Sequence, residues 1–130
     1  MVDLVVFGVT GDVGFSVAKH LSKTFRIHGV CYDVNQERQS VLSAEGVAVS
    51  KFDRKSLSDV TRGVKFAFVT TKSSFTDNSS HKHELEEGMA IADACKTNDV
   101  THVVYMTQHH VANAIGLSAR QADAKVIRYS

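Results

Sequence analysis

The sequence has no proline, only two cysteines, almost no excess of either charge and no apolar run of membrane-spanning length. Its 15 basic residues stand against 14 acidic ones, which leaves a formal net charge of +1. With this balance, the chain has no excess of basic residues that would attract nucleic acid or an anionic membrane surface. No apolar stretch approaches the roughly 20 residues that span a bilayer, so we expect neither nucleic-acid nor membrane partners.

Two further absences bear on the cellular compartment. The sequence begins Met1-Val2-Asp3 and enters an apolar run directly, without the basic segment, long apolar segment and cleavage site of a secretory signal. Cys31 and Cys95 show no pattern of partners, so we expect reduced, buried thiols rather than a disulfide. Together these features predict a cytoplasmic protein.

Strand and helix patterns alternate through the whole sequence. With 130 residues, 43% of them hydrophobic, the chain has enough material for one core and too little for two, so we expect one domain over residues 1–130. Apolar runs predict five strands, at residues 4–7, 27–32, 47–52, 65–70 and 101–106. Helical spacing predicts five helices, at residues 15–23, 36–44 and 56–62, after a polar loop at 73–80, and from 111 to the end.

This alternation is typical of an α/β protein. Successive strand–helix units build a parallel sheet covered by helices on both faces, and right-handed crossovers restrict the possible topologies. We therefore predict a doubly wound parallel sheet, the Rossmann fold, with about five strands in the order 3-2-1-4-5.

A glycine-rich turn separates the first predicted strand from the first predicted helix. Its pattern is Gly8-x-x-Gly11-x-x-Gly14. In dinucleotide-binding domains the first such glycine allows the tight turn, the second lets the backbone approach a pyrophosphate, and the third lets helix and strand pack closely. The helix start that follows offers free N–H groups and a positive dipole end to phosphates. The turn therefore predicts a pyrophosphate site.

Acidic residues follow the second and third predicted strands. Asp33 stands where such domains read the adenosine ribose; it would accept both hydroxyls and repel a 2′-phosphate, which favours NAD over NADP. Arg38, close by, favours the opposite preference. Asp53 lies at a carboxyl strand end, where it would bind the adenine amino group. The alternative for Asp33 is that it caps the next helix. The alternatives for Asp53 are that it caps the helix at Ser56 or is a solvated surface residue.

The sequence resembles the NmrA-like proteins, atypical members of the short-chain dehydrogenase/reductase superfamily. The resemblance is carried by the glycine loop at residues 8–14, the segment FDRKSL at 52–57 and the strand end VYMT at 104–107. It covers essentially the whole chain but only the N-terminal half of a usual member. Family members continue into a subdomain that builds the substrate pocket, so we expect a Rossmann portion truncated before that subdomain.

The resemblance implies a domain that binds NAD or NADP, in a family of redox sensors and NADPH-dependent reductases. Six residues match the family's phosphate-binding loop or lie within it: Gly8, Thr10, Gly11, Asp12, Val13 and Gly14. Tyr32 falls where many members carry an arginine for the 2′-phosphate, which puts NADP preference in doubt. Four further residues match cofactor-facing positions of the family: Asp53, Thr70, Thr71 and Thr107.

Catalytic residues are less clearly indicated. A short-chain reductase needs a tyrosine acid four residues before a lysine that lowers its pKa, but Gln121 precedes Lys125 at that spacing. Lys125 falls near the family's helix lysine and would act alone; the alternative is a solvated helix lysine. His109 follows the fifth predicted strand, as a proton donor or a plain loop residue. His81 and His83 lack a third ligand, so we expect no metal site.

We therefore predict an NAD(P)-binding protein that works by binding, as a redox sensor or regulator with a protein partner or as a homodimer. A chain without the wall of a substrate pocket is poorly built to exclude water or orient a substrate, so we expect no independent catalysis. Two alternatives stay open. One is an NAD(P)H-dependent reductase of quinones or similar acceptors, completed by oligomerisation or by a partner; the other is a shortened product that binds nothing.

Overall fold

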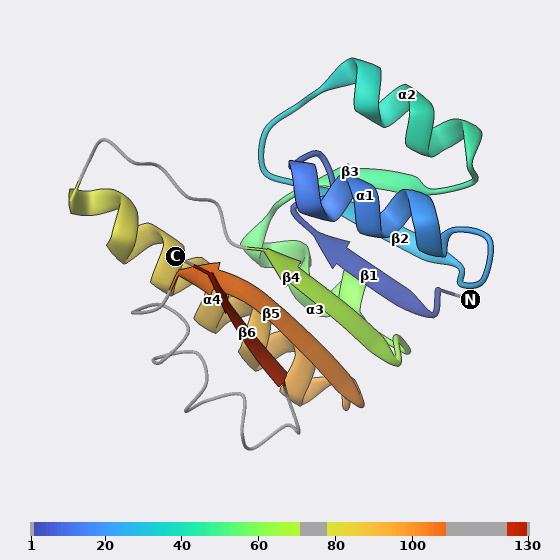
Figure 1. Ribbon diagram of the computed structural model, residues 1–130. Helices are drawn as coiled ribbons and strands as arrows, with labels where there is room; N and C mark the ends of the chain where they lie inside the picture. The colour runs from blue at the N-terminus through green and yellow to red at the C-terminus, as the bar shows by residue number, and fades with distance from the viewer. Residues whose placement is uncertain (1, 71–77, 109–124, 130) are drawn as a thin grey trace.

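Strands and helices alternate along the chain, as the apolar patterning predicts (Figure 1). The computed structural model describes residues 2–70, 78–108 and 125–129, with side chains for residues 2–70 and 86–105. The strands are β1 (Leu4–Phe7), β2 (Ile27–Cys31), β3 (Ala48–Lys51), β4 (Phe66–Thr70), β5 (His102–Gln108) and β6 (Lys125–Tyr129). The helices are α1 (Asp12–Leu21), α2 (Gln36–Ala44), the 3-10 turn η1 (Arg54–Ser56), α3 (Leu57–Thr61) and α4 (Asn78–Thr97).

The described strands form one parallel sheet in the order β3-β2-β1-β4-β5-β6. β1 lies inside the sheet, with Leu4 in register with Ile27 on one side and with Phe66 on the other. The chain moves outward from β1 to β3, crosses back to β4 and then continues outward to β6. The predicted order of the first five strands is confirmed, and so is the doubly wound α/β fold. The reversal separates β1 from β4, which is where such sheets bind ligands.

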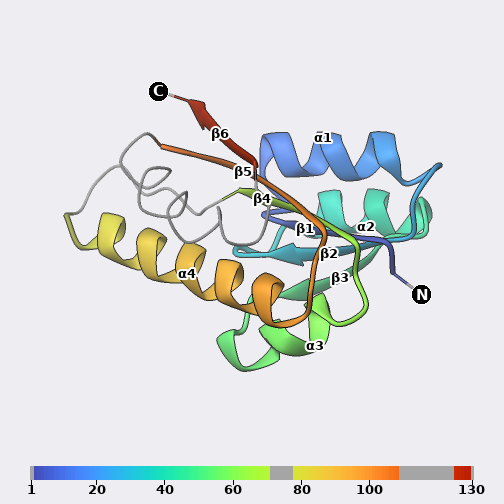
Figure 2. The same ribbon diagram turned by 90° about the horizontal axis from the view of Figure 1, so that it is seen from below.

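Helices cover both faces of the sheet, α1 and α2 on one side and α3 and α4 on the other (Figure 2). Alternate residues of a strand point to opposite faces. In β1, Leu4 and Val6 belong to the apolar cluster that includes residues of α1 and α2, whereas Val5 and Phe7 belong to the cluster of α3 and α4. Both faces of β1 are therefore buried, which explains its uninterrupted apolar sequence.

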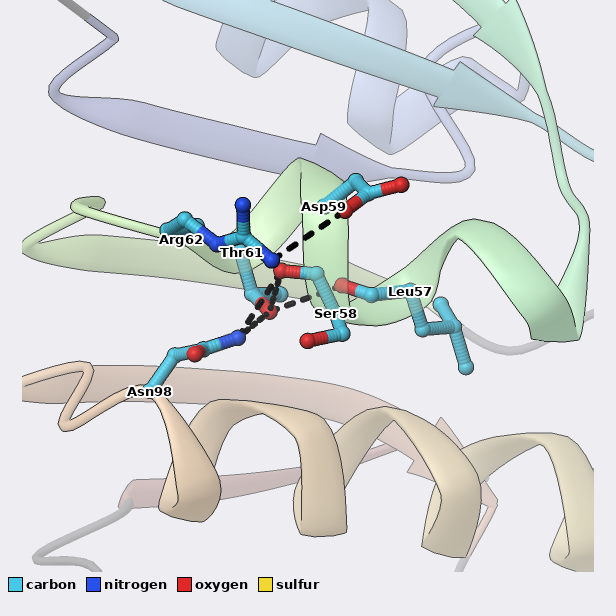
Figure 3. Close-up of polar contacts among 6 residues, drawn as sticks. All are labelled: Leu57, Ser58, Asp59, Thr61, Arg62 and Asn98. Atoms are coloured by element: carbon cyan, nitrogen blue, oxygen red, sulfur yellow. Dashed lines mark hydrogen bonds and ion pairs between the residues drawn. The ribbon is translucent and has the colours of Figure 1, made fainter.

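A polar cluster joins α3 to the end of α4 (Figure 3). Asn98, which follows α4, donates from Nδ2 to the Ser58 carbonyl oxygen at 2.9 Å and to Thr61 Oγ1 at 2.8 Å. The buried Thr61 hydroxyl donates in turn to the Leu57 carbonyl oxygen at 2.7 Å. These bonds fix the short helix α3 against the carboxyl end of α4.

The carboxyl-terminal prediction was wrong for the last described residues. We expected helix from residue 111 to the end, but Lys125–Tyr129 form β6, with Lys125 in register with Val104 of β5. β-branched and aromatic side chains make up most of this segment, and pairing with β5 satisfies its backbone groups. Residues 111–124 lie outside the described residues.

Helix starts also differ from the prediction. α1 begins at Asp12 rather than at residue 15, because the helix incorporates the end of the glycine turn. η1 precedes α3, and α4 begins at Asn78, so residues 78–80 are helical although we expected them in a loop. None of the helices described is both long and apolar enough to cross a membrane.

Candidate functional site

The glycine turn lies at the carboxyl edge of the sheet, between β1 and α1. The backbone N–H groups of Gly8 and Val9 donate to the Val30 carbonyl oxygen at 2.7 and 3.1 Å, which ties the turn to β2. On the other side, Thr70 Oγ1 donates to the Phe7 carbonyl oxygen at 3.0 Å. The turn is therefore held between the ends of β2 and β4, at the point where the strand order reverses.

Two of the three glycines are required by the packing of the turn itself. Gly8 has φ +86°, and a Cβ at this position would overlap Thr70 Oγ1. Gly14 is buried in the first turn of α1, and a Cβ there would overlap the Gly8 carbonyl oxygen. Any side chain at either position would push α1 or β4 away from the turn. The prediction that the third glycine permits close packing agrees with these contacts.

Gly11 differs from the other two glycines. It is exposed, and its φ of −76° suits any residue. Among the described residues, a Cβ would approach only the Gly8 carbonyl oxygen, at 3.3 Å. A side chain at Gly11 therefore requires the Gly8 carbonyl oxygen to move by a few tenths of an ångström, a smaller change than at Gly8 or Gly14. What glycine provides here is open space above the turn, which is the property that close approach of a phosphate needs.

The start of α1 has no side-chain cap. Gly11 takes the N-cap position, and having no side chain it supplies no cap hydrogen bond to the first turn. The backbone N–H groups at a helix start carry the positive end of the helix dipole. An open glycine turn followed by an uncapped helix start has the geometry that binds phosphate groups.

Arg38, in the first turn of α2, reaches across to the glycine turn. Its Nη1 donates to the Thr10 carbonyl oxygen at 2.9 Å, and its Nη2 pairs with Asp12 Oδ1 at 2.9 Å. The guanidinium carbon lies 5.0 Å from the centre of the Phe15 ring. Arg38 is thus held by three residues of the turn and of α1, and α2 is tied to the turn.

The end of β2 is also tied to the glycine turn and to β4. Thr10 Oγ1 donates to the Asp33 carbonyl oxygen at 2.9 Å. The Tyr32 hydroxyl donates to the Thr70 carbonyl oxygen at 2.7 Å, and its ring centre lies 5.3 Å from that of Phe52. The structure therefore brings the predicted residues Thr10, Tyr32, Asp33 and Thr70 together at one edge.

Of the two acidic residues that could cap a helix, Asp33 does not and Asp53 does. Asn35 is the N-cap of α2, where its Oδ1 accepts from the Arg38 N–H at 3.0 Å, so Asp33 does not cap this helix. Asp53 does act as a cap: its Oδ1 accepts from the Lys55 N–H at 3.0 Å at the start of η1. The Asp53 carboxylate thus has a structural role, and it lies next to Phe52, beside Tyr32.

The sequence did not predict the contacts that fix this edge. Arg38 was expected only near the ribose, and its bonds to Thr10 and Asp12 and its position over Phe15 are found only in the structure. Two sequence features indicate these contacts: Arg38 stands early in the helix after the predicted ribose-binding strand end, and Phe15 stands in the first turn of α1. Neither feature predicts that the two side chains are in contact.

Other predicted residues lie elsewhere. Thr71 and His109 fall outside the described residues. Thr107 lies near the end of β5, paired with Arg128, and only its backbone is described. Lys125 does not lie on a helix as expected: its backbone is level with Val104, which is level with Phe68 and Val6 in the middle of the sheet. This register gives no support to a catalytic role for Lys125 at the carboxyl edge.

The described chain offers little for acid–base or metal chemistry. Tyr105 is 1% exposed, and burial raises the pKa of its hydroxyl, with Cys95 and Asp93 adding to the shift. It is therefore no proton donor at neutral pH. Both cysteines are free and buried, as predicted. No three His, Cys, Asp or Glu side chains gather into a metal site within the part of the chain that the structure describes.

The sequence matches the family model described as the NmrA-like family over residues 2–121. Among solved structures, the chain is similar to the Citrobacter sp. triphenylmethane reductase complexed with NADP(H), at 21% identity and a TM-score of 0.79. The match covers 98% of this chain and 49% of the reductase.

Two further structures have the same fold. The chain is similar to an NADPH-dependent quinone oxidoreductase from Escherichia coli complexed with NADPH, at 20% identity and a TM-score of 0.70, over 96% of this chain and 48% of that one. It is similar to MoeE5 in complex with UDP-glucose and NAD, at 14% identity and a TM-score of 0.76, over 95% of this chain and 52% of that one. The chain thus spans about half the length of these three proteins, and at such identities the likeness shows the fold.

Proposed function

The chain belongs to the NmrA-like family, and from that premise we propose that its glycine turn binds the pyrophosphate of a nicotinamide dinucleotide, NAD or NADP. The observation that carries the proposal is the difference among the glycines. Gly8 and Gly14 are required by packing, whereas Gly11 leaves open space over an uncapped helix start. The complexes of the structural neighbours with NADP(H), NADPH and NAD support this choice of ligand.

The adenosine end of the dinucleotide is proposed to lie at the ends of β2 and β3. There Asp33 would bind the ribose hydroxyls, and Asp53 would lie on the adenine side. Thr70 at the end of β4 would face the middle of the cofactor, with Thr71 and Thr107 continuing that edge. A bound nicotinamide would supply hydride exchange; the residues named here would bind and orient it.

We propose further that the chain acts as a redox sensor or regulator whose dinucleotide occupancy is read by a protein partner or a second copy. The proposal rests on the absence, among the described side chains, of a tyrosine–lysine pair at the carboxyl edge. A ligand changes a conformational equilibrium only through its differential affinity for two states, so the partner must bind the occupied and empty forms differently. Both cysteines are free and buried, which favours a cytoplasmic location. We also propose that residues 1–130 form one domain.

Gly11→Val tests the dinucleotide site. Because a side chain at this position requires only a small shift of one carbonyl oxygen, we expect the variant to fold. Its isopropyl group would fill the space that the pyrophosphate needs. In a thermal-shift titration with NAD, NADH, NADP and NADPH, the wild-type chain should be stabilised by about 2.7 kcal/mol at a hundredfold excess over Kd. The variant should show no saturable shift.

The control is Ala44→Val, which places the same valine side chain at an exposed position at the end of α2. It should keep the wild-type response to each dinucleotide. If no dinucleotide stabilises the wild-type chain, or if Gly11→Val responds as the control does, the proposed site is wrong.

The second candidate function is a dinucleotide-dependent reductase completed by a second copy or by a partner. The similarity to two reductases favours it. Oxidation of NADH or NADPH by a panel of quinones would be the readout, measured over a range of protein concentrations. Activity that rises more steeply than the protein concentration, and that is lost in His109→Ala, would favour this candidate over a regulator.

A further inference from the structure

The ion pair between Arg38 and Asp12 lies next to the proposed ribose site. Arg38 Nη1 is bonded to the Thr10 carbonyl oxygen at 2.9 Å, while Thr10 Oγ1 is bonded to the Asp33 carbonyl oxygen at 2.9 Å. The guanidinium therefore lies beside Thr10, the residue that links the glycine turn to the end of β2. In dinucleotide-binding domains, an arginine close to the ribose-reading position accommodates a 2′-phosphate.

The Asp12 carboxylate competes for this guanidinium. Nη2 of Arg38 lies 2.9 Å from Asp12 Oδ1, so the positive charge already has an anionic partner. A 2′-phosphate would have to share Arg38 with Asp12 or displace it, and it would also be repelled by the carboxylate. A dinucleotide without a 2′-phosphate meets neither cost, because its ribose hydroxyls are neutral.

The two partners of the ion pair differ in how firmly they are held, because only the Asp12 side chain is almost fully exposed to solvent. The Asp12 side chain is 92% exposed, whereas that of Arg38 is 32% exposed and packs over Phe15. Removal of the Asp12 charge should therefore leave Arg38 in place, held by the Thr10 carbonyl oxygen and the Phe15 ring. The carboxylate is the removable partner of a guanidinium that is otherwise fixed.

We propose that Asp12 is a specificity-determining residue: by holding Arg38 it biases the site against a 2′-phosphate and hence toward NAD over NADP. This inference rests on the proposed dinucleotide site. It differs from reading the ribose through the end of β2, because the discriminating carboxylate belongs to the first turn of α1, on the pyrophosphate side of the site.

The test compares two probes of the adenosine end, AMP and adenosine 2′,5′-bisphosphate, by titration calorimetry. The quantity of interest is the ratio of their dissociation constants, in which the repulsion of Asp12 on the shared 5′-phosphate cancels. An exposed ion pair is worth up to about 1 kcal/mol, so Asp12→Asn should shift the ratio about fivefold in favour of the bisphosphate. The same shift should appear in the ratio for NADP and NAD.

Two further variants separate the proposed mechanism from a general charge effect. Asp59→Asn removes one charge from a comparable exposed pair, Asp59 with Arg62 at 3.3 Å, and should leave the ratio unchanged. In an Arg38→Ala background, Asp12→Asn should no longer shift the ratio, because the guanidinium that couples the two anions is gone. A cooperative thermal unfolding transition in each variant is the control for folding.

The outcomes are distinct from those of the glycine-turn experiment. In one case Gly11→Val abolishes dinucleotide binding while Asp12→Asn leaves the ratio of dissociation constants unchanged, or shifts it equally in the absence of Arg38. Either result for the ratio overturns this inference and leaves the proposed function standing. Absence of any dinucleotide binding overturns both. A shift seen only when Arg38 is present supports the role of Asp12.

Discussion

His28 on β2 is a partly buried titratable group at some distance from the proposed site. Its Nε2 lies 2.8 Å from Ser50 Oγ on β3, which binds the ring across the two strands. Burial lowers the pKa of this imidazole below its ordinary value of 6.5, because the charged form loses hydration. The unfolded chain therefore binds the proton first as the pH falls.

We expect His28 to make the free energy of unfolding fall as the pH decreases below about 6.5. The contribution is absent well above that pH and is complete once the pH is below the folded-state pKa. His28→Gln keeps a polar side chain opposite Ser50 and removes the proton site. Urea unfolding at pH 7.5 and 5.5 should show a smaller loss of stability in the variant than in the wild type. An identical loss would show that another group is responsible.

The polar cluster between α3 and α4 makes a prediction at the scale of elements. Asn98→Ala removes the donor that serves the Ser58 carbonyl oxygen and Thr61 Oγ1, while the bond from Thr61 to the Leu57 carbonyl oxygen remains. The loss should destabilise the chain by about 1 to 2 kcal/mol, measured by urea unfolding. Thr101→Ala, which removes a single exposed hydrogen bond to the Lys65 carbonyl oxygen, is the control and should cost less. Equal effects would mean that the cluster does not stabilise the α3–α4 contact.

The elements near the amino terminus could be predicted because both periodicities are strong there. The strand–turn–helix unit around the glycines and the cap-like Asp53 each had a local signal. β6 could not be predicted in this way, because its apolar positions fit helical and strand spacing alike, and only pairing with β5 decides between them. The start of α1 was missed since Gly14, a poor helix former, is helical here for packing reasons.

In the candidate site, too, local features could be predicted from the sequence and contacts between elements could not. The glycine spacing located the turn, but it did not show that Gly11 is free of the packing that requires Gly8 and Gly14. The contact between Arg38 and Asp12 joins residues of two helices, so no local pattern encodes it. Such contacts follow from the relative placement of whole elements, which sequence periodicity does not determine.

At the scale of the whole molecule, the two cysteines report on opening of the fold. Cys31 is 1% and Cys95 0% exposed, and burial raises the pKa of both thiols, that of Cys95 to about 12. Neither thiol should react with an aromatic disulfide reagent at pH 7 until the chain opens, because the reagent needs an accessible thiolate. Labelling followed over increasing urea should coincide with the unfolding transition. Labelling well below that transition would show that one face of the sheet opens separately.

The position of β1 inside the sheet has a consequence for synthesis of the chain. β1 is translated before its partner β4, which begins only at Phe66, after two helices, two strands and the η1–α3 segment. At about 5 to 20 residues per second, one edge of this apolar strand stays unpaired on the ribosome for a time on the order of seconds. We therefore expect this edge of β1 to be open to pairing with other chains until β4 emerges and covers it.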